Sequence, residues 1–167
     1  MAVPSPEQCI AIVSFANRAY ADVFNAALAL LYGCGAQGVE VLGVKRGHIT
    51  MSERMRVHIV GPQERTVPVP NGVAQRLLRI TDDCSAGSSE EFVFSRAGKQ
   101  LTHDALRWEL KQRSRLLGMR RPLVETDLRL AFVAHMTDRQ MPIEVISTMM
   151  GLTNVNNIDR MLIRALS

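Results

Sequence analysis

The residues of this 167-residue chain best suited to bind a ligand are clustered cations. The segment from 96 to 121 contains eight basic side chains against two acidic ones, Asp104 and Glu109. Its net charge is +6, whereas the rest of the chain carries about −2 of the total of +4. Such a concentration of positive charge suits a polyphosphate partner, because phosphates release their condensed counterions when basic side chains neutralise them. A solvated helix whose charges only maintain solubility is the alternative. The basic residues are Arg96, Lys99, Arg107, Lys111, Arg113, Arg115, Arg120 and Arg121.

The cysteines and histidines show no spacing typical of a metal site or a disulfide framework. The three cysteines are odd in number and contain no CxxC pair. The histidines lack the HExxH and HxxxH spacings that place two ligands on one helical face. We therefore expect no metal, no other cofactor and no small-molecule substrate. The residues concerned are Cys9, Cys34, Cys84, His48, His58, His103 and His135.

Length and composition indicate one globular domain spanning 1–167. Hydrophobic residues make up 47% of the chain and charged residues 22%, close to globular averages. The longest apolar stretch, 26–32, is far shorter than the ~20 residues that cross a membrane. The N-terminus also lacks the pattern of a signal peptide. We expect a cytoplasmic protein that makes no membrane contact.

Helical spacing and capping residues predict several helices. Ser5-Pro6-Glu7-Gln8 has the form of a capping box, and apolar spacing predicts two helices, or one broken helix, over 6–33. A short helix is expected at 39–44, and Asn71 can cap the next one. Thr102 or His103 opens a helix with Leu106, Leu110 and Leu117 on its core side. Three more are predicted over 126–138, 142–150 and 154–166.

Alternation of apolar and polar residues predicts one β-hairpin. Met55, Val57 and Ile59 alternate with polar residues, a turn follows at 61–64, and Val67 and Val69 continue the pattern. The acidic, glycine-rich stretch 82–91 is expected to be a surface loop, and 92–94 an edge strand or buried connector. The predicted fold class is α+β, mainly α, with a small antiparallel sheet.

These elements carry motifs whose order resembles one family, the catalytic domain of tyrosine recombinases, which includes phage integrases and Xer-type proteins. The resemblance covers about 6–166 and rests on all the motifs in register. In that family the matching stretches read TGLRxxE, a hairpin ending ERxVPLP, HxLRHTFATH, LLGH, and a tyrosine nine residues later. The stretches here are Gly33 to Glu40, Arg65 to Pro70, Thr126 to Arg129 and Met149 to Leu152.

The resemblance implies that most catalytic positions have been substituted. Two family residues are kept, the acidic Glu40 and the second arginine, Arg129. The positions of the first arginine, the hairpin lysine, the two histidines and the tyrosine are occupied by Gln37, Val60 (at or near the lysine position), Thr126, Leu152 and Met161 respectively.

In the family mechanism a tyrosine oxygen attacks the scissile phosphate, while arginines, histidine and lysine stabilise charge and transfer protons. A methionine thioether has no proton to lose and cannot form a phosphotyrosyl bond. The only tyrosines, Tyr20 and Tyr32, lie in the first helical region. We therefore expect a protein that does not cut DNA, unless another chain supplies the nucleophile.

DNA binding can survive the loss of catalysis. Arg129 is either a phosphate contact or a semi-buried arginine paired with Glu40 or Asp127. On the helix from Thr102, the resemblance implies base contacts by Thr102, His103 and Arg107 and phosphate contacts by Lys111 and Arg115. A solvated helix face remains the alternative. Further backbone contacts are expected from residues flanking the hairpin, namely Lys45, Arg46, His48 and Arg65.

Two hypotheses about function follow. The first is a catalytically inactive, double-stranded-DNA-binding regulator or accessory factor of a mobile genetic element, active in recombination, integration or conjugation. The second is a protein-interaction partner of an active recombinase or other element protein, without DNA contact of its own. Cleavage by a different nucleophile is a weaker third hypothesis. The family's N-terminal core-binding domain is expected to be absent, so binding would need help from a homo-oligomer or partner. Trp108 and the late methionines are expected in the core.

Overall fold

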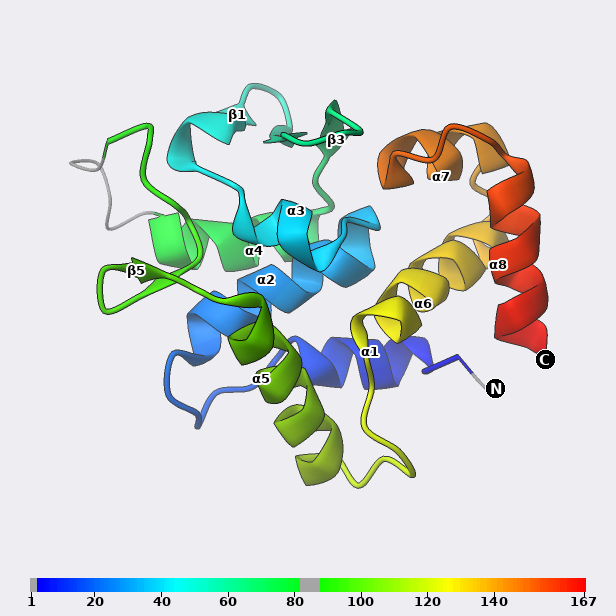
Figure 1. The fold of residues 1–167 in the computed structure, drawn as a ribbon, viewed down its shortest axis with the longest axis horizontal. Helices are drawn as coiled ribbons and strands as arrows, with labels where there is room; N and C mark the ends of the chain where they lie inside the picture. The colour runs from blue at the N-terminus through cyan, green and yellow to red at the C-terminus, as the bar shows by residue number, and fades with distance from the viewer. Residues whose placement is uncertain (1–2, 82–87) are drawn as a thin grey trace.

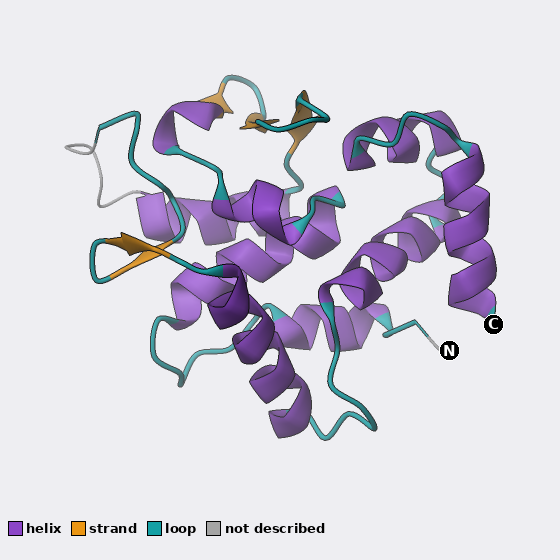
Figure 2. Ribbon diagram, viewed as in Figure 1, coloured by secondary structure: helices purple, strands orange, loops and turns teal. Residues whose placement is uncertain are grey.

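The structure, a computed structural model, describes residues 3–81 and 88–167. Its elements in chain order are α1 Pro6–Ile12, α2 Ala21–Cys34, α3 Gly38–Leu42, the 3-10 helix η1 Arg46–His48, β1 Ile49–Met51, β2 Met55–Ile59, β3 Arg65–Pro68, α4 Asn71–Thr81, β4 Ser95–Arg96, β5 Lys99–Gln100, α5 His103–Leu116, α6 Glu125–Asp138, α7 Ile143–Met150 and α8 Asn156–Leu166. Most of the chain is helical, with small strands at the margins (Figure 2). The predicted mainly α, α+β class is confirmed.

Helix α2 forms the centre of the core because it is apolar on almost every side. Its buried residues include Phe24, Leu28, Leu30 and Leu31, and it contacts α3, α4, α5 and α6 (Figure 1). A helix without a polar face must be enclosed by other elements. Gly35 ends α2 at φ +67°, and a Cβ there would lie 2.8 Å from Phe132 and Met150. Only glycine suits this position.

The sheet beside α3 is antiparallel, with strand order β1-β2-β3. The predicted hairpin is its β2–β3 pair, in which Val57 faces Val67, and alternate residues of β2 are buried. Strand β1 was missed, because its three residues are exposed or half-buried and show no alternation. The two-residue strands β4 and β5 were missed for the same reason.

Most predicted helix boundaries are confirmed. Ser5 accepts a hydrogen bond from Gln8 N and Gln8 reciprocates, so the capping box forms. Thr102 caps α5 through Ala105 N, and Gly151 closes α7 in the left-handed conformation. Within the predicted loop 82–91, residues 82–87 lie outside the described residues, and 88–91 are exposed. Residues 93–94 form a buried connector.

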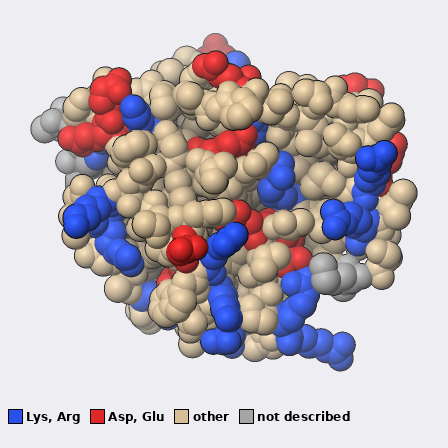
Figure 3. Space-filling view, in the orientation of Figure 1, with Lys and Arg blue, Asp and Glu red and all other residues tan. Residues whose placement is uncertain are grey.

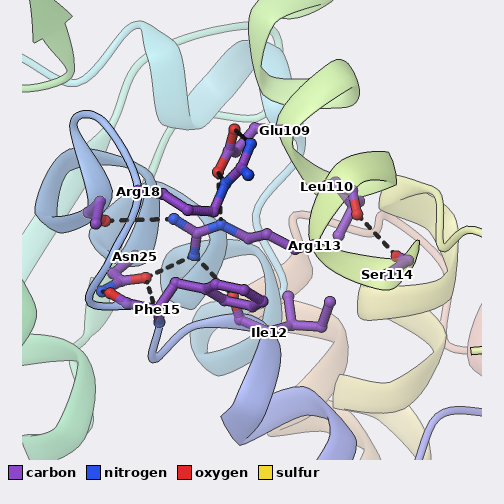
Figure 4. A network of polar contacts seen from close by, with 9 residues as sticks. Ile12, Phe15, Arg18, Asn25, Glu109, Leu110, Arg113 and Ser114 are labelled. Atoms are coloured by element: carbon purple, nitrogen blue, oxygen red, sulfur yellow. Dashed lines mark hydrogen bonds and ion pairs between the residues drawn. The ribbon is translucent and has the colours of Figure 1, made fainter. Parts of the chain in front are cut away.

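Two core assignments and one surface assignment on α5 or directly after it were wrong. Leu117 is 39% exposed, and Trp108 is 58% exposed. Arg113, counted with the basic surface, is instead fully buried. It donates to Glu109, Asn25 Oδ1 and the carbonyl oxygen of Ile12, so one guanidinium joins α5, α1 and α2 (Figure 4). A buried charge must be paired in this way, and sequence spacing alone does not reveal the partners.

Candidate nucleic-acid interface

An ion pair between Glu40 of α3 and Arg65 of β3 lies at the junction of the recombinase-like motifs. Both side chains are less than a tenth exposed, and Arg65 Nη1 and Nη2 lie 2.8 and 2.9 Å from the two carboxylate oxygens. Arg65 Nε also donates to the Met149 carbonyl oxygen at 2.7 Å. One guanidinium therefore joins α3, β3 and α7.

Arg65, which the sequence predicts to contact the DNA backbone, is largely engaged within the protein. All three of its nitrogens are hydrogen-bonded within the protein, and Nη1 donates additionally to the Gln63 carbonyl oxygen at 2.7 Å. Four of the five N–H donors of the guanidinium are thus used within the protein. Arg65 therefore joins the surrounding motifs, and its contact with the DNA backbone stays a prediction.

Gln37 and Thr126, from distant parts of the sequence, lie on neighbouring helix starts. Gln37 N donates to Glu40 Oε2 at 2.8 Å, which fixes the first turn of α3. A Cβ added at Gly38 would collide with the Glu125 carboxylate, so α3 approaches the start of α6 closely. Both Gln37 and Thr126 are exposed. The structure thus brings together the two positions that the resemblance assigns to the first arginine and the first histidine.

Arg129 lies one turn beyond Thr126 on the same face of α6. Its Nε donates to the Gly35 carbonyl oxygen at 3.2 Å, while its buried Nη2 has no hydrogen-bond partner within the described part of the chain. Burial lowers the pKa of Arg129, and the nearby Glu40 carboxylate opposes this shift. The guanidinium keeps an unused donor.

The expected alternative, an ion pair of Arg129 with Glu40 or Asp127, is not formed. Glu40 pairs with Arg65, and Asp127 accepts two hydrogen bonds from Arg121 at 2.7 and 2.8 Å. Arg121 is therefore also partly withdrawn from the basic surface. Neither carboxylate is bonded to Arg129 itself.

The other family positions lie on separate elements. Leu152 follows Gly151, where φ is +69° and a Cβ would lie 2.5 Å from Arg65 Nη1. The end of α7 therefore packs against the ion pair of Glu40 and Arg65. Val60 is 52% exposed just after β2. Met161 is partly buried, and its helix α8 packs against α6.

The two tyrosines are engaged elsewhere. Tyr32 Oη lies 2.8 Å from Nδ1 of His135, which is about 9 Å further along α6 than Arg129 at 1.5 Å per residue. Burial raises the pKa of Tyr32 to about 12. Tyr20 precedes α2 and lies beneath the guanidinium of Arg96, 5.8 Å from its ring centroid.

Helix α5 presents an exposed row of cations. Arg107, Lys111 and Arg115 follow one another at four-residue spacing, and all are exposed. Only a loose contact of 3.9 Å joins Arg107 to Asp104. In the view of Figure 3, blue side chains gather over α5 and over the β4–β5 hairpin. We call the exposed row of Arg107, Lys111 and Arg115 the cationic ridge.

The ridge continues toward the recombinase-like motifs. A hollow of about 500 Å³ lies between α5 and residues 122–126, and its lining includes Arg107, Lys111 and Thr126. At the start of α5, His103 Nε2 lies 2.5 Å from Glu125 Oε1. Thr102 is exposed beside it. Cations of α5 and the start of α6 thus border one surface.

Lys45, which is also expected to contact the DNA backbone, is engaged by residues of the segment before β4. Its ammonium is 2.9 Å from Glu90 Oε2 and 5.5 Å from the ring centroid of Phe92. The surface also includes residues that were not predicted as site residues, the exposed Arg96 and Lys99 of the β4–β5 hairpin. Their charge was evident in the sequence, but nothing there predicted a hairpin that would place them near α5.

Comparison with known proteins gives one consistent result. A model of the phage integrase family matches residues 5–161. Tyrosine recombinase XerD of Pseudomonas putida is 26% identical over 138 residues, which represent 79% of this chain and 46% of that protein. The chain therefore spans about half the length of this relative.

Solved structures share the fold at low sequence identity. XerA recombinase superposes with a TM-score of 0.84 at 14% identity, covering 96% of this chain and 58% of its own. XerH recombinase bound to its difH substrate superposes with a TM-score of 0.77 at 16% identity. The match covers 99% of this chain and 53% of the XerH chain. The Tn1549 transposon integrase in complex with transposon right end DNA superposes with a TM-score of 0.78 at 16% identity. The match covers 98% of this chain and 63% of the integrase chain.

Proposed function

Because the chain belongs to the phage integrase family, we propose that it is a catalytically inactive, double-stranded-DNA-binding member that acts as a regulator or accessory factor of a mobile genetic element. The observation that carries the proposal is the exposed row Arg107, Lys111 and Arg115, which leads across one hollow to Thr126, one turn from Arg129. A row of cations at helical spacing matches the phosphates that border a DNA groove. We expect the protein to act in the cytoplasm.

The unused donor of Arg129 supports the same proposal. A buried polar nitrogen without a partner is uncommon and calls for an explanation, such as an absent ligand. A phosphate oxygen would accept from a guanidinium and offset its burial. Gly35 would hold the guanidinium in place through the bond to Nε.

The proposed inactivity rests on what stands at the catalytic positions. Met161 cannot attack phosphorus, and Gln37, Thr126 and Leu152 cannot supply the cationic stabilisation of an arginine and two histidines. The positions of Tyr32 and Tyr20 described above do not offer a replacement nucleophile.

The relatives support DNA as the partner. The XerH structure is described as bound to a difH substrate, and the Tn1549 integrase as bound to transposon DNA. The second is the integrase of a mobile element, which motivates the proposed setting. Since this chain spans only part of these proteins, the activity of the whole recombinase is not carried over.

The test is binding of the purified protein to a labelled random duplex pool across a salt series. We expect affinity to fall steeply with salt. Arg107→Ala/Lys111→Ala should reduce the slope of log K against log salt by about 2, because each lost phosphate contact removes roughly 0.9.

The matched control is Arg79→Ala/Arg139→Ala, which removes the same charge from exposed sites on α4 and after α6. Its slope should stay close to the wild-type value. Absence of duplex binding at low salt would overturn the proposal, and equal effects of the two double variants would show that only net charge matters.

A second candidate function, docking on another protein, is favoured by helix α8. Its exposed apolar side chains include Ile163 and Leu166, which are 67% and 87% exposed, while Ile158 of the same helix is fully buried. The partner would be a second copy of this chain or an active recombinase. Truncation after Gly151 would remove Ile158 from the core, so point variants are the better test.

Ile163→Lys/Leu166→Lys should abolish co-purification of partners from the native host if α8 is the docking surface, with the fold retained. Sedimentation of the pure protein would identify self-association. An unchanged set of partners and an unchanged mass would contradict this candidate.

A further inference from the structure

Trp108 is a large aromatic side chain exposed within the cationic ridge. It is 58% exposed and lies three residues before Lys111 and seven before Arg115, so the three share one stripe of α5. Cations interleaved with an exposed aromatic ring suit a nucleic acid, because the ring offers a face on which a base can stack. The chain contains a single tryptophan.

Trp108 borders a hollow of about 490 Å³ between α5, β4 and the segment that joins α1 to α2. Phe24 contributes to the lining, with Arg18 and Arg96 beside it. The Arg18 guanidinium lies 6.0 Å from the Trp108 ring centroid, and that of Arg96 lies 5.8 Å from the ring centroid of Tyr20, which is 48% exposed. Two partly exposed rings, each with an arginine over one face, thus lie near one hollow.

The wall of this hollow is held by a buried polar network (Figure 4). Glu109 accepts from Arg18 at 2.7 and 3.0 Å and from Arg113 at 2.9 Å. Arg113 donates in turn to Asn25 Oδ1 of α2. Because these groups satisfy one another, the segment carrying Arg18 is fixed against α5 next to Trp108.

We propose that this hollow binds an unstacked base of DNA, which stacks on Trp108 while Arg96 and Lys111 contact the flanking phosphates. Paired bases within a regular duplex expose no free face to a side chain, so the hollow would favour bulged, gapped or single-stranded DNA. The inference rests on the proposed function, because it assigns a substrate form to the same DNA-binding surface. Charge complementarity favours a polyanion over an uncharged apolar ligand.

The test uses the fluorescence of Trp108. The protein is titrated with a plain duplex and with the same duplex carrying a three-nucleotide bulge, in separate arms. We expect strong quenching by bulged DNA and little by the duplex, since stacking brings a base onto the ring. Trp108→Ala should lose roughly tenfold or more in affinity for bulged DNA, with duplex affinity within about twofold.

Trp108→Phe keeps a ring and should retain most of the preference for bulged DNA, measured by anisotropy of labelled DNA. Leu116→Ala is the control, because Leu116 is an exposed apolar residue on the same helix. Equal affinity for both DNA forms, unaffected by Trp108→Ala and without quenching, would overturn the inference but leave duplex binding intact. Failure to bind any DNA would overturn the proposed function as well.

Discussion

Arg129 combines burial, a hydrogen bond to Gly35 and an unused donor, so its structural role and its proposed phosphate contact can be separated by substitution. Arg129→Met keeps an apolar stem while removing the buried charge. We expect unchanged or slightly raised thermal stability, because the desolvation cost disappears. Duplex affinity should fall roughly 10- to 100-fold, the value of a charge-assisted hydrogen bond.

Thermal unfolding by circular dichroism and binding at fixed salt check both parts. Arg120→Met is the control, because Arg120 is exposed and its substitution removes the same charge. A large loss of stability in Arg129→Met with unchanged affinity would indicate a purely structural arginine.

Met161 allows a direct test of the proposed inactivity. By the proposed assignment, Met161→Tyr would restore only the nucleophile, while Gln37, Thr126 and Leu152 would still lack the groups that stabilise the transition state. We expect neither the wild type nor this variant to nick supercoiled plasmid or form a covalent protein–DNA adduct, as assayed by denaturing electrophoresis. An adduct in the wild type that disappears in Arg129→Ala would contradict the proposed inactivity.

Helix α5 depends on its buried arginine for its position. Arg113 is fully buried and bonded to Glu109, Asn25 and the Ile12 carbonyl oxygen. Arg113→Ala should lower the free energy of unfolding by about 3–5 kcal/mol, because it leaves buried acceptors unpaired. Arg115→Ala, two residues later and exposed, should change it by less than about 0.5 kcal/mol. Equal free energies of unfolding for the two variants, measured by urea denaturation, would show that the network contributes little to stability.

For the whole molecule, the same network predicts how stability depends on pH. Burial opposes ionisation of Glu109, but hydrogen bonds from Arg18 and Arg113 outweigh it and lower its pKa below the ordinary 4.5. A carboxyl whose pKa is lower in the folded state stabilises the protein fully above its unfolded pKa. That contribution is lost as the pH falls from 4.5 through the folded pKa.

We therefore expect the free energy of unfolding of the wild type to decline below about pH 4.5. Glu109→Gln should be less stable at pH 7, and its deficit should shrink as the pH falls, because the wild type then loses the same charge. Urea denaturation between pH 3 and 7 measures this. A deficit independent of pH would contradict the assigned role of Glu109.

The sequence by itself determined the helices, the β2–β3 hairpin, the family and the ridge of α5. Caps such as Ser5, Thr102 and Gly151 act within a few residues, and helical periodicity places Arg107, Lys111 and Arg115 on one face whatever surrounds them. The motifs from Gly33 to Leu152 are likewise read in register along the chain. Local interactions and linear order need no tertiary information.

The tertiary structure alone decided which charged and aromatic side chains are available to a ligand. Arg65 and Arg113 look like surface cations in the sequence, yet each is buried against a carboxylate, Glu40 or Glu109. Trp108, by composition a core residue, is exposed. An arginine can be buried only where a distant segment supplies a hydrogen-bond acceptor, as Ile12 and Asn25 do for Arg113. No residue pattern along the chain predicts such a long-range contact.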